Sequence, residues 1–74
     1  MVYYMIVEEL LNDLFTNRHI TLTKALEQRF AEYLKTYGIT MSVLDYLQWL
    51  EQQGKIRVLA LPGTNILKLQ RIYP

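Results

Sequence analysis

The sequence contains no cysteine and a single histidine, His19. The lack of cysteine excludes disulfides, thiolate zinc sites and cysteine nucleophiles, and one histidine cannot build a histidine-based metal cluster. No uninterrupted apolar run approaches the roughly 20 residues that span a bilayer. The apolar start has no basic region before it, and Glu8 and Glu9 follow directly, so no signal peptide is predicted. We expect a soluble, intracellular, cytoplasmic protein with no membrane partner.

Sequence features that support catalysis are also scarce. His19 has no serine or cysteine nearby with which to form a nucleophile system. Glu8 and Glu9 are adjacent, so on a helix they point apart and do not form a working carboxylate pair. The three glycines are scattered, which excludes a glycine-rich phosphate loop. The sequence therefore predicts a protein that is not an enzyme and that has no cofactor or metal site.

What the chain has is a hydrophobic content of 51% in 74 residues, enough for one packed domain over residues 1–74. Its net charge of +1 is unevenly distributed. Residues 1–17 carry three acids and no base, and residues 18–54 are balanced. Residues 55–74 carry no acid and four bases, Lys55, Arg57, Lys68 and Arg71. This segregation favours an anionic partner at the carboxyl end, and a solvated hairpin with ordinary surface charges is the alternative.

Apolar periodicity predicts three helices. The first covers about residues 2–15 and has an apolar stripe wider than a single packed face requires. The second starts after Thr23, a capping residue, and ends at Gly38, which places Ile39 to contact Leu34. The third starts after Thr40 and ends near residue 53. Between the second and third helices we expect a turn of only three residues, 38–40.

Three short segments have strand character. Residues 19–22 alternate around two apolar side chains, and residues 55–61 and 66–73 are rich in β-branched and aliphatic residues. The segment 62–65, Pro-Gly-Thr-Asn, is a turn on composition alone. The carboxyl-terminal part is therefore predicted to be a β-hairpin, in which Lys68 and Gln70 share one face and Arg57 and Arg71 fall elsewhere in the alternation.

Two stretches carry a resemblance to a known family: the turn Gly38-Ile39-Thr40, and the spacing of Val43, Leu47 and Leu50 before Gly54-Lys55-Ile56. Over the whole chain, the order of elements resembles a winged helix-turn-helix domain, an α+β fold with a carboxyl-terminal two-stranded wing. The resemblance implies a small protein that binds double-stranded DNA, commonly a transcriptional regulator. It places the third helix, about 40–53, in the major groove and the hairpin, 55–73, against the backbone. A winged-helix module that binds a protein and not DNA is the alternative.

The third helix should present polar side chains outward, and glutamine can recognise adenine there. It offers no lysine or arginine, however, and Asp45 would repel phosphate, so a solvated polar face is equally compatible. Trp49 either stacks on a nucleotide or packs half-buried against the hairpin. The predicted DNA-binding residues of this region are Thr40, Ser42, Gln48, Trp49 and Gln52.

Basic residues outside the third helix are predicted to contact phosphates, which orient a protein without carrying sequence information. Lys24 lies at the amino terminus of the second helix, where free N–H groups favour an anion; a surface pair with Glu27 is the alternative. The predicted phosphate contacts are Arg18, Lys24, Lys55, Arg57 and Lys68.

Aromatic and apolar residues of the first helix suggest self-association, because uncovered apolar patches usually mark interfaces. We expect a homodimer in which both chains use the same patch. Its predicted members are Tyr3, Tyr4, Val7, Leu11 and Phe15. Tyr33 and Tyr37 of the second helix are predicted to lie in the core and not to form a stacking platform for single strands.

Overall fold

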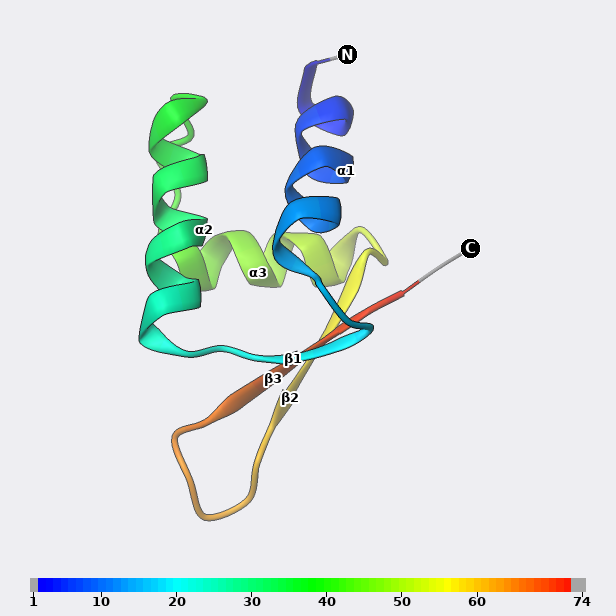
Figure 1. The fold of residues 1–74 in the computed structure, drawn as a ribbon, viewed down its shortest axis with the longest axis vertical. Helices are drawn as coiled ribbons and strands as arrows, with labels where there is room; N and C mark the ends of the chain where they lie inside the picture. The colour runs from blue at the N-terminus through cyan, green and yellow to red at the C-terminus, as the bar shows by residue number, and fades with distance from the viewer. Residues whose placement is uncertain (1, 73–74) are drawn as a thin grey trace.

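The computed structural model describes residues 2–72, and side chains from residue 7 onward. Within that range the chain forms α1 (Val2–Leu14), β1 (His19–Thr21), α2 (Lys24–Thr36), α3 (Val43–Gln52), β2 (Ile56–Ala60) and β3 (Leu67–Arg71). Helices α1 and α2 stand side by side, α3 crosses them, and the hairpin extends away from the helices (Figure 1). The fold is α+β, as predicted.

The ends of α2 follow from local sequence. The side chain of Thr23 accepts a hydrogen bond from the backbone N–H of Leu26, 3.1 Å away, and so caps the helix as predicted. At the other end Gly38 adopts a positive φ of 69°, which glycine tolerates best. The backbone N–H of Ile39 then donates to the carbonyl of Leu34 at 2.8 Å. This is the predicted helix stop, in which the chain turns back over its last carbonyls.

The start of α3 differs from the prediction. Ser42, and not Thr40, is the capping residue: its hydroxyl accepts a hydrogen bond from the N–H of Asp45 at 3.2 Å. The connection between the two helices therefore runs over residues 37–42, and the expected three-residue turn is wrong. Thr40 and Ser42 are both good caps, but a start at Ser42 also puts Asp45 in the first turn, where the helix dipole favours a carboxylate.

The three strands form one antiparallel sheet in the order β1-β3-β2. The predicted short strand is confirmed, and it pairs with β3, from His19 opposite Gln70 to Thr21 opposite Lys68. Both hairpin strands are shorter than predicted. In the turn Gly63 takes a positive φ of 74°, and the N–H of Thr64 donates to the carbonyl of Leu61 at 3.2 Å. The strands end where this local turn replaces ladder bonds.

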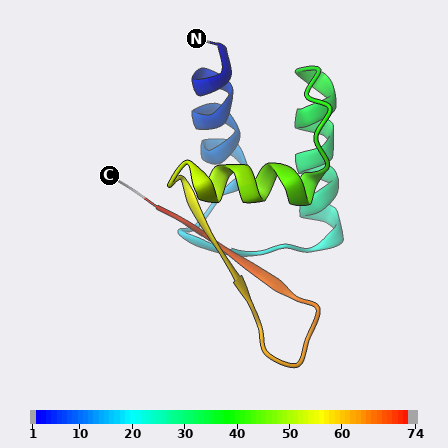
Figure 2. The same cartoon turned by 180° about the vertical axis from the view of Figure 1, so that it is seen from behind.

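The hydrophobic core lies between the three helices and one face of the sheet (Figure 2). Because α1 packs against α2 and the rest of this core, the described part of its apolar stripe, from Val7 onward, is covered within the single chain. Twelve buried residues form the core: Val7, Leu10, Leu11, Leu14, Phe15, Phe30, Leu34, Tyr46, Leu47, Leu50, Ile56 and Leu69. The core thus covers the flank of α1 at Phe15, and the flank at Ile6 lies outside the described side chains.

The second-helix tyrosines are less buried than predicted. Tyr33 packs against the core while partly exposed, and Tyr37 is 40% exposed. Their rings stack on each other with centroids 6.2 Å apart, so Tyr37 extends the stripe outward along the helix surface and does not enter the core. Among the described residues, no helix is long and apolar enough to cross a membrane.

Candidate functional site

The two faces of the sheet differ in chemistry because successive strand residues point to opposite sides. Ile56 of β2 and Leu69 of β3 are fully buried, and Ile20 and Val58 pack beside them against the core. This apolar set is the inner face. The cross-strand register fixes the complementary set on the opposite side, away from the core.

That opposite side, here called the outer sheet face, consists of two cross-strand rows. In one row Gln70 lies between His19 and Arg57, and in the other Lys68 lies between Thr21 and Leu59. Directly opposed residues of an antiparallel pair share a face, so Arg57 shares a face with Lys68 and Gln70. The prediction that Arg57 falls elsewhere is wrong, whereas Arg71 does lie on the opposite side of β3.

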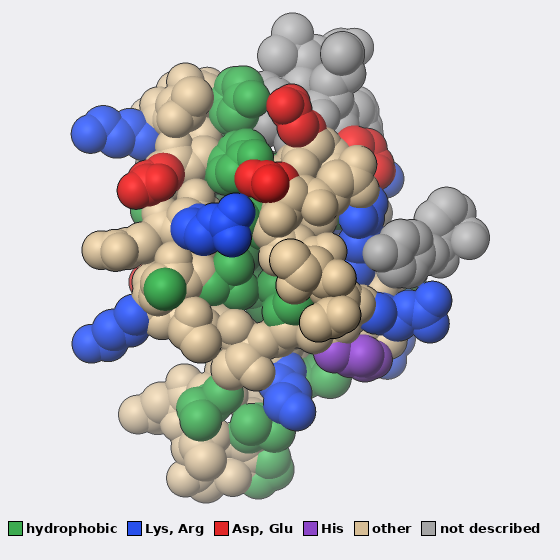
Figure 3. All heavy atoms as spheres, in the orientation of Figure 1, with side chains coloured by type: hydrophobic (Ala, Val, Ile, Leu, Met, Phe, Trp, Pro, Cys, Tyr) green, Lys and Arg blue, Asp and Glu red, His purple; other side chains and the backbone are tan. Residues whose placement is uncertain are grey.

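The outer sheet face is rich in hydrogen-bond donors and contains no carboxylate. Arg57 and Lys68 are exposed, and no described residue forms an ion pair with either. Neighbouring strands lie about 4.8 Å apart, so the residues of this face project their imidazole, amide, guanidinium and ammonium groups from adjacent strands on one side of the sheet. In Figure 3 the visible acidic side chains gather over α1 and α2, and none lies over the sheet and hairpin. The arrangement is suited to an anionic partner.

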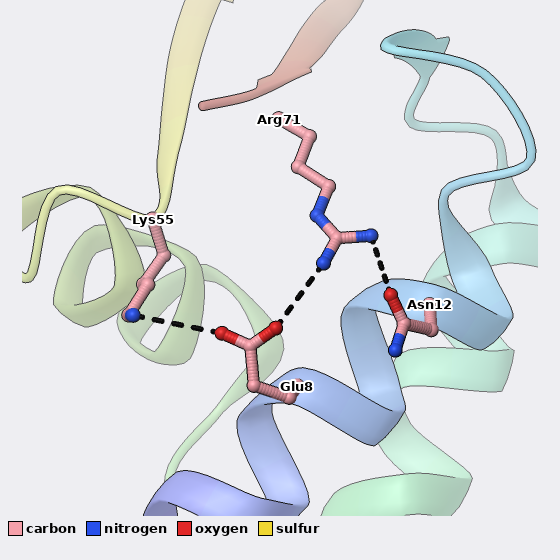
Figure 4. Close-up of polar contacts among 4 residues, drawn as sticks. All are labelled: Glu8, Asn12, Lys55 and Arg71. Atoms are coloured by element: carbon pink, nitrogen blue, oxygen red, sulfur yellow. Dashed lines mark hydrogen bonds and ion pairs between the residues drawn. The ribbon is translucent and has the colours of Figure 1, made fainter. Parts of the chain in front are cut away.

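The other two bases of the carboxyl-terminal segment are engaged within the molecule (Figure 4). The carboxylate of Glu8 on α1 lies 3.6 Å from the ammonium of Lys55 and 3.3 Å from the guanidinium of Arg71. Arg71 also donates to the side-chain oxygen of Asn12 at 2.8 Å. Lys55, predicted to contact phosphate, therefore lies beside an acid. We call Glu8, Asn12, Lys55 and Arg71 the α1–hairpin clamp.

The exposed side of α3, the helix predicted to enter the major groove, is acidic. Gln48 and Gln52 are exposed as predicted, but Asp45 and Glu51 are exposed with them and no base accompanies them. The carboxylate of Glu51 accepts a hydrogen bond from the N–H of Val58 at 3.0 Å, at the free edge of β2. Such a surface disfavours close approach to phosphates.

Trp49 is half-buried, as one of its two predicted roles requires. Its ring stacks on that of Tyr46, with centroids 5.6 Å apart and an interplanar angle of 27°. Tyr46 is fully buried. Trp49 thus covers a core tyrosine of its own helix. The hydroxyl of Ser42 accepts the capping hydrogen bond from Asp45.

Arg18, Lys24 and Thr40 are exposed and lie outside the two rows of the outer sheet face, Lys24 at the start of α2 and Thr40 in the connection between α2 and α3. Arg18 precedes β1, and its carbonyl accepts the N–H of Arg71 at 2.8 Å. Lys24 and Glu27 line an open hollow of about 470 Å³ between α2 and the start of α3, without an ion pair to each other. Thr40 lines an adjoining hollow of about 270 Å³.

The predicted dimer patch is divided by the structure. Val7, Leu11 and Phe15 are at most 5% exposed within the single chain, so they cannot form a contact surface while the fold is intact. The side chains of Tyr3 and Tyr4 lie outside the described residues. Dimerisation therefore stays a prediction, without the three residues that the core takes.

A second polar contact attaches α1 to α2. The hydroxyl of Tyr33 donates to the carboxylate of Asp13 at 2.5 Å, and Asp13 lies 3.6 Å from the guanidinium of Arg29. This hydrogen bond, with lesser contributions from burial and from nearby negative charge, raises the pKa of Tyr33 to about 12. The phenol keeps its proton at neutral pH and acts as a donor.

Sequence reasoning missed the role of His19 and Gln70 in the outer sheet face and the whole α1–hairpin clamp. One signal was present: three acids at the start of the chain and four bases at its end are complementary, and they meet in the clamp. Among the described residues, no group of three or more acidic or histidine side chains could hold a metal ion. Comparison with protein-family models, curated proteins and solved structures finds no match.

Proposed function

We propose that this chain is a winged-helix domain that binds nucleic acid, double-stranded DNA in the first place, through the phosphate backbone. The outer sheet face is the contact surface. The observation that carries the proposal is its composition: Arg57, Lys68, His19 and Gln70 offer donors on one side of the sheet, with no carboxylate among them. Charge of this kind supplies most of the affinity in sequence-independent DNA binding.

The order of elements supports the winged-helix part of the proposal. The order helix, short strand, two helices and a hairpin is the one that the sequence resemblance implies, and the short strand pairs with the hairpin. In this proposal the hairpin and β1 face the backbone. A transcriptional role remains a prediction, because it requires recognition of a particular site as well as affinity.

Sequence recognition by α3 is not part of the proposal. Arginine to guanine is the commonest specific contact, and the exposed side of α3 has no base. Asp45 and Glu51 would meet the negative potential of the groove. Gln48→Ala should therefore leave both affinity and discrimination among sequences unchanged, and the emission of Trp49 should change little on binding.

Fluorescence anisotropy with a labelled 20-base-pair duplex of mixed sequence tests the proposal. We expect Kd values of about 1–100 μM at moderate salt, with log Kd rising linearly with log salt. Lys68→Gln should reduce the slope by about one. Lys35→Gln is the matched control: it removes the same charge from an exposed residue near the end of α2 and should leave the slope unchanged.

Two outcomes would count against the proposal, the first against DNA binding itself and the second against the outer sheet face as the contact surface. The first is the absence of binding below about 100 μM at 50 mM salt, which is weaker than ordinary non-specific affinity. The second is an equal effect of Lys68→Gln and Lys35→Gln, which would mean that only net charge matters. A large change in Trp49 emission would instead indicate that α3 contacts the DNA.

A protein-binding module is the second candidate, and exposed apolar residues favour it. Leu44 on α3 is 53% exposed, and Leu59 and Ile66 on the hairpin are also exposed. Large exposed aliphatic side chains are costly to leave in water and are common at protein interfaces. Leu44→Ser together with Ile66→Ser, both outside the two rows of the outer sheet face, separates the candidates: duplex affinity should persist if the bases carry the function.

A further inference from the structure

The α1–hairpin clamp has unequal arms. The side chain of Arg71 is only 10% exposed and is held by both Glu8 and Asn12. That of Lys55 is 34% exposed and contacts Glu8 across 3.6 Å, a longer and looser approach. Glu8 itself is 55% exposed. One carboxylate thus serves two cations: it fixes Arg71 in place and holds Lys55 where solvent can still reach it.

We propose that Glu8 is a positioning residue that withholds Lys55 from nucleic-acid phosphates and thereby confines backbone contact to the outer sheet face. The inference rests on the proposed function. The carboxylate of Glu8 lies 3.6 Å from the ammonium of Lys55. A phosphate that approached this ammonium would therefore also come close to the carboxylate, and the two negative charges would repel. Lys55 therefore contributes little to binding, although the sequence places it beside Arg57 in a basic segment.

Arg71 gives the clamp its second role. Its guanidinium joins the end of β3 to α1 through Glu8 and Asn12, across 63 and 59 positions of sequence. This contact holds the base of the hairpin against the helices, so the orientation of the outer sheet face relative to α1 is fixed. Neutralising Glu8 as glutamine preserves an oxygen that can accept from Arg71, while it removes the charge that retains Lys55.

A comparison of Glu8→Gln with Glu9→Gln tests the inference. Glu9 is the neighbouring exposed acid, and no described residue forms an ion pair with it, so both variants change the net charge equally. With the duplex and salt series used above, Glu8→Gln should steepen the log–log slope by about 0.9, the value for one added phosphate contact. Glu9→Gln should leave the slope unchanged.

Lys55→Gln provides a second test that leaves Arg71 and its partners in place. In the otherwise unchanged chain it should alter neither affinity nor slope, unlike Lys68→Gln. In the Glu8→Gln background, Lys55→Gln should abolish the increase in salt slope that Glu8→Gln causes. Equal slopes for Glu8→Gln and Glu9→Gln, or a loss on Lys55→Gln alone that matches Lys68→Gln, would overturn the inference. Should Glu8→Gln fail to fold by circular dichroism, Lys55→Gln alone still decides.

The two proposals fail in different ways. If the proposed function is wrong, the unchanged chain and every variant will lack duplex binding. If only the clamp inference is wrong, binding will be present with slopes that do not distinguish Glu8 from Glu9. Acylation of Lys55, followed by mass spectrometry, reports on the clamp without DNA: it should be faster in Glu8→Gln than in Glu9→Gln.

Discussion

The inner and outer faces of the sheet consist of alternate residues of the same strands, and the two faces have different roles. In β3, Leu69 is fully buried while its neighbours Lys68 and Gln70 lie on the outer sheet face. The inner face contributes apolar area to the core, and the outer face contributes donors that no described residue pairs. A period of two thus lets five-residue strands stabilise the fold and present a surface at the same time.

The same division applies to the cations of the hairpin. Arg71 lies on the inner side and is taken up by Glu8 and Asn12, whereas Arg57 and Lys68 remain outside. Four bases in the sequence therefore amount to two on the candidate surface. When an acidic helix packs against a basic segment, the net charge of that segment overstates the positive charge that is exposed to a partner.

Replacing Leu69 should give the largest contrast between the faces. Leu69→Ala removes a fully buried side chain and should lower the free energy of unfolding by about 2–5 kcal/mol. Lys68→Ala, one residue away, should change it by no more than about 0.5 kcal/mol. Chemical denaturation followed by circular dichroism measures both. Similar losses for the two variants would mean that the outer sheet face is also structural.

Replacing Arg71, on the inner side of the sheet, and Arg57, on its outer face, should give an intermediate difference in stability. Arg71→Ala removes its hydrogen bonds to Asn12 and Glu8 and should cost about 1.5 kcal/mol, near the low end for charged partners because Glu8 is half-exposed. Arg57→Ala should be nearly neutral for stability but should weaken duplex binding. If Arg71→Ala weakens binding as strongly as Arg57→Ala without unfolding the chain, the division of cations between the faces is wrong.

Local sequence was enough to predict the helices and their glycine stops, because a cap or a left-handed glycine acts within a few residues. The start of α3 was missed for the same reason: Thr40 and Ser42 both satisfy the local rule, and only the observed bond to Asp45 decides between them. The stripe of α1 predicts an interface that includes Val7, Leu11 and Phe15, whereas the core buries these three, because periodicity along one helix does not tell how many neighbours cover it.

The candidate site was less predictable than the fold. The face of Arg57 depends on how β2 pairs with β3, and alternation within either strand alone leaves that register open. The clamp joins residues 63 positions apart, and its members are ordinary polar residues in the sequence. Charge segregation predicts an anionic partner at the carboxyl end, and it does not show which side chains of the two ends meet.

Replacing Tyr33 should have a smaller effect on stability than replacing Leu69 or Arg71. Its contact with Asp13 attaches α1 to α2 away from the sheet, so the variant is also a control for the comparison of the two sheet faces. The pKa of Tyr33 is raised above its ordinary value of 10.0 to about 12, chiefly by its hydrogen bond to Asp13. The folded state therefore holds this proton more tightly than the unfolded state. The associated stability is fully present below pH 10 and is lost as pH rises through about 12.

Tyr33→Phe should lower the free energy of unfolding at neutral pH by about 0.5–1.5 kcal/mol, the net worth of one hydrogen bond. Between pH 10 and 12 its stability should fall less steeply than that of the unchanged chain. Tyrosinate absorbance should lose the component that titrates near pH 12. The salt slope of duplex binding should not change, since Tyr33 lies on neither face of the sheet. A changed slope would show that the attachment of α1 to α2, and not the outer sheet face alone, governs contact with DNA.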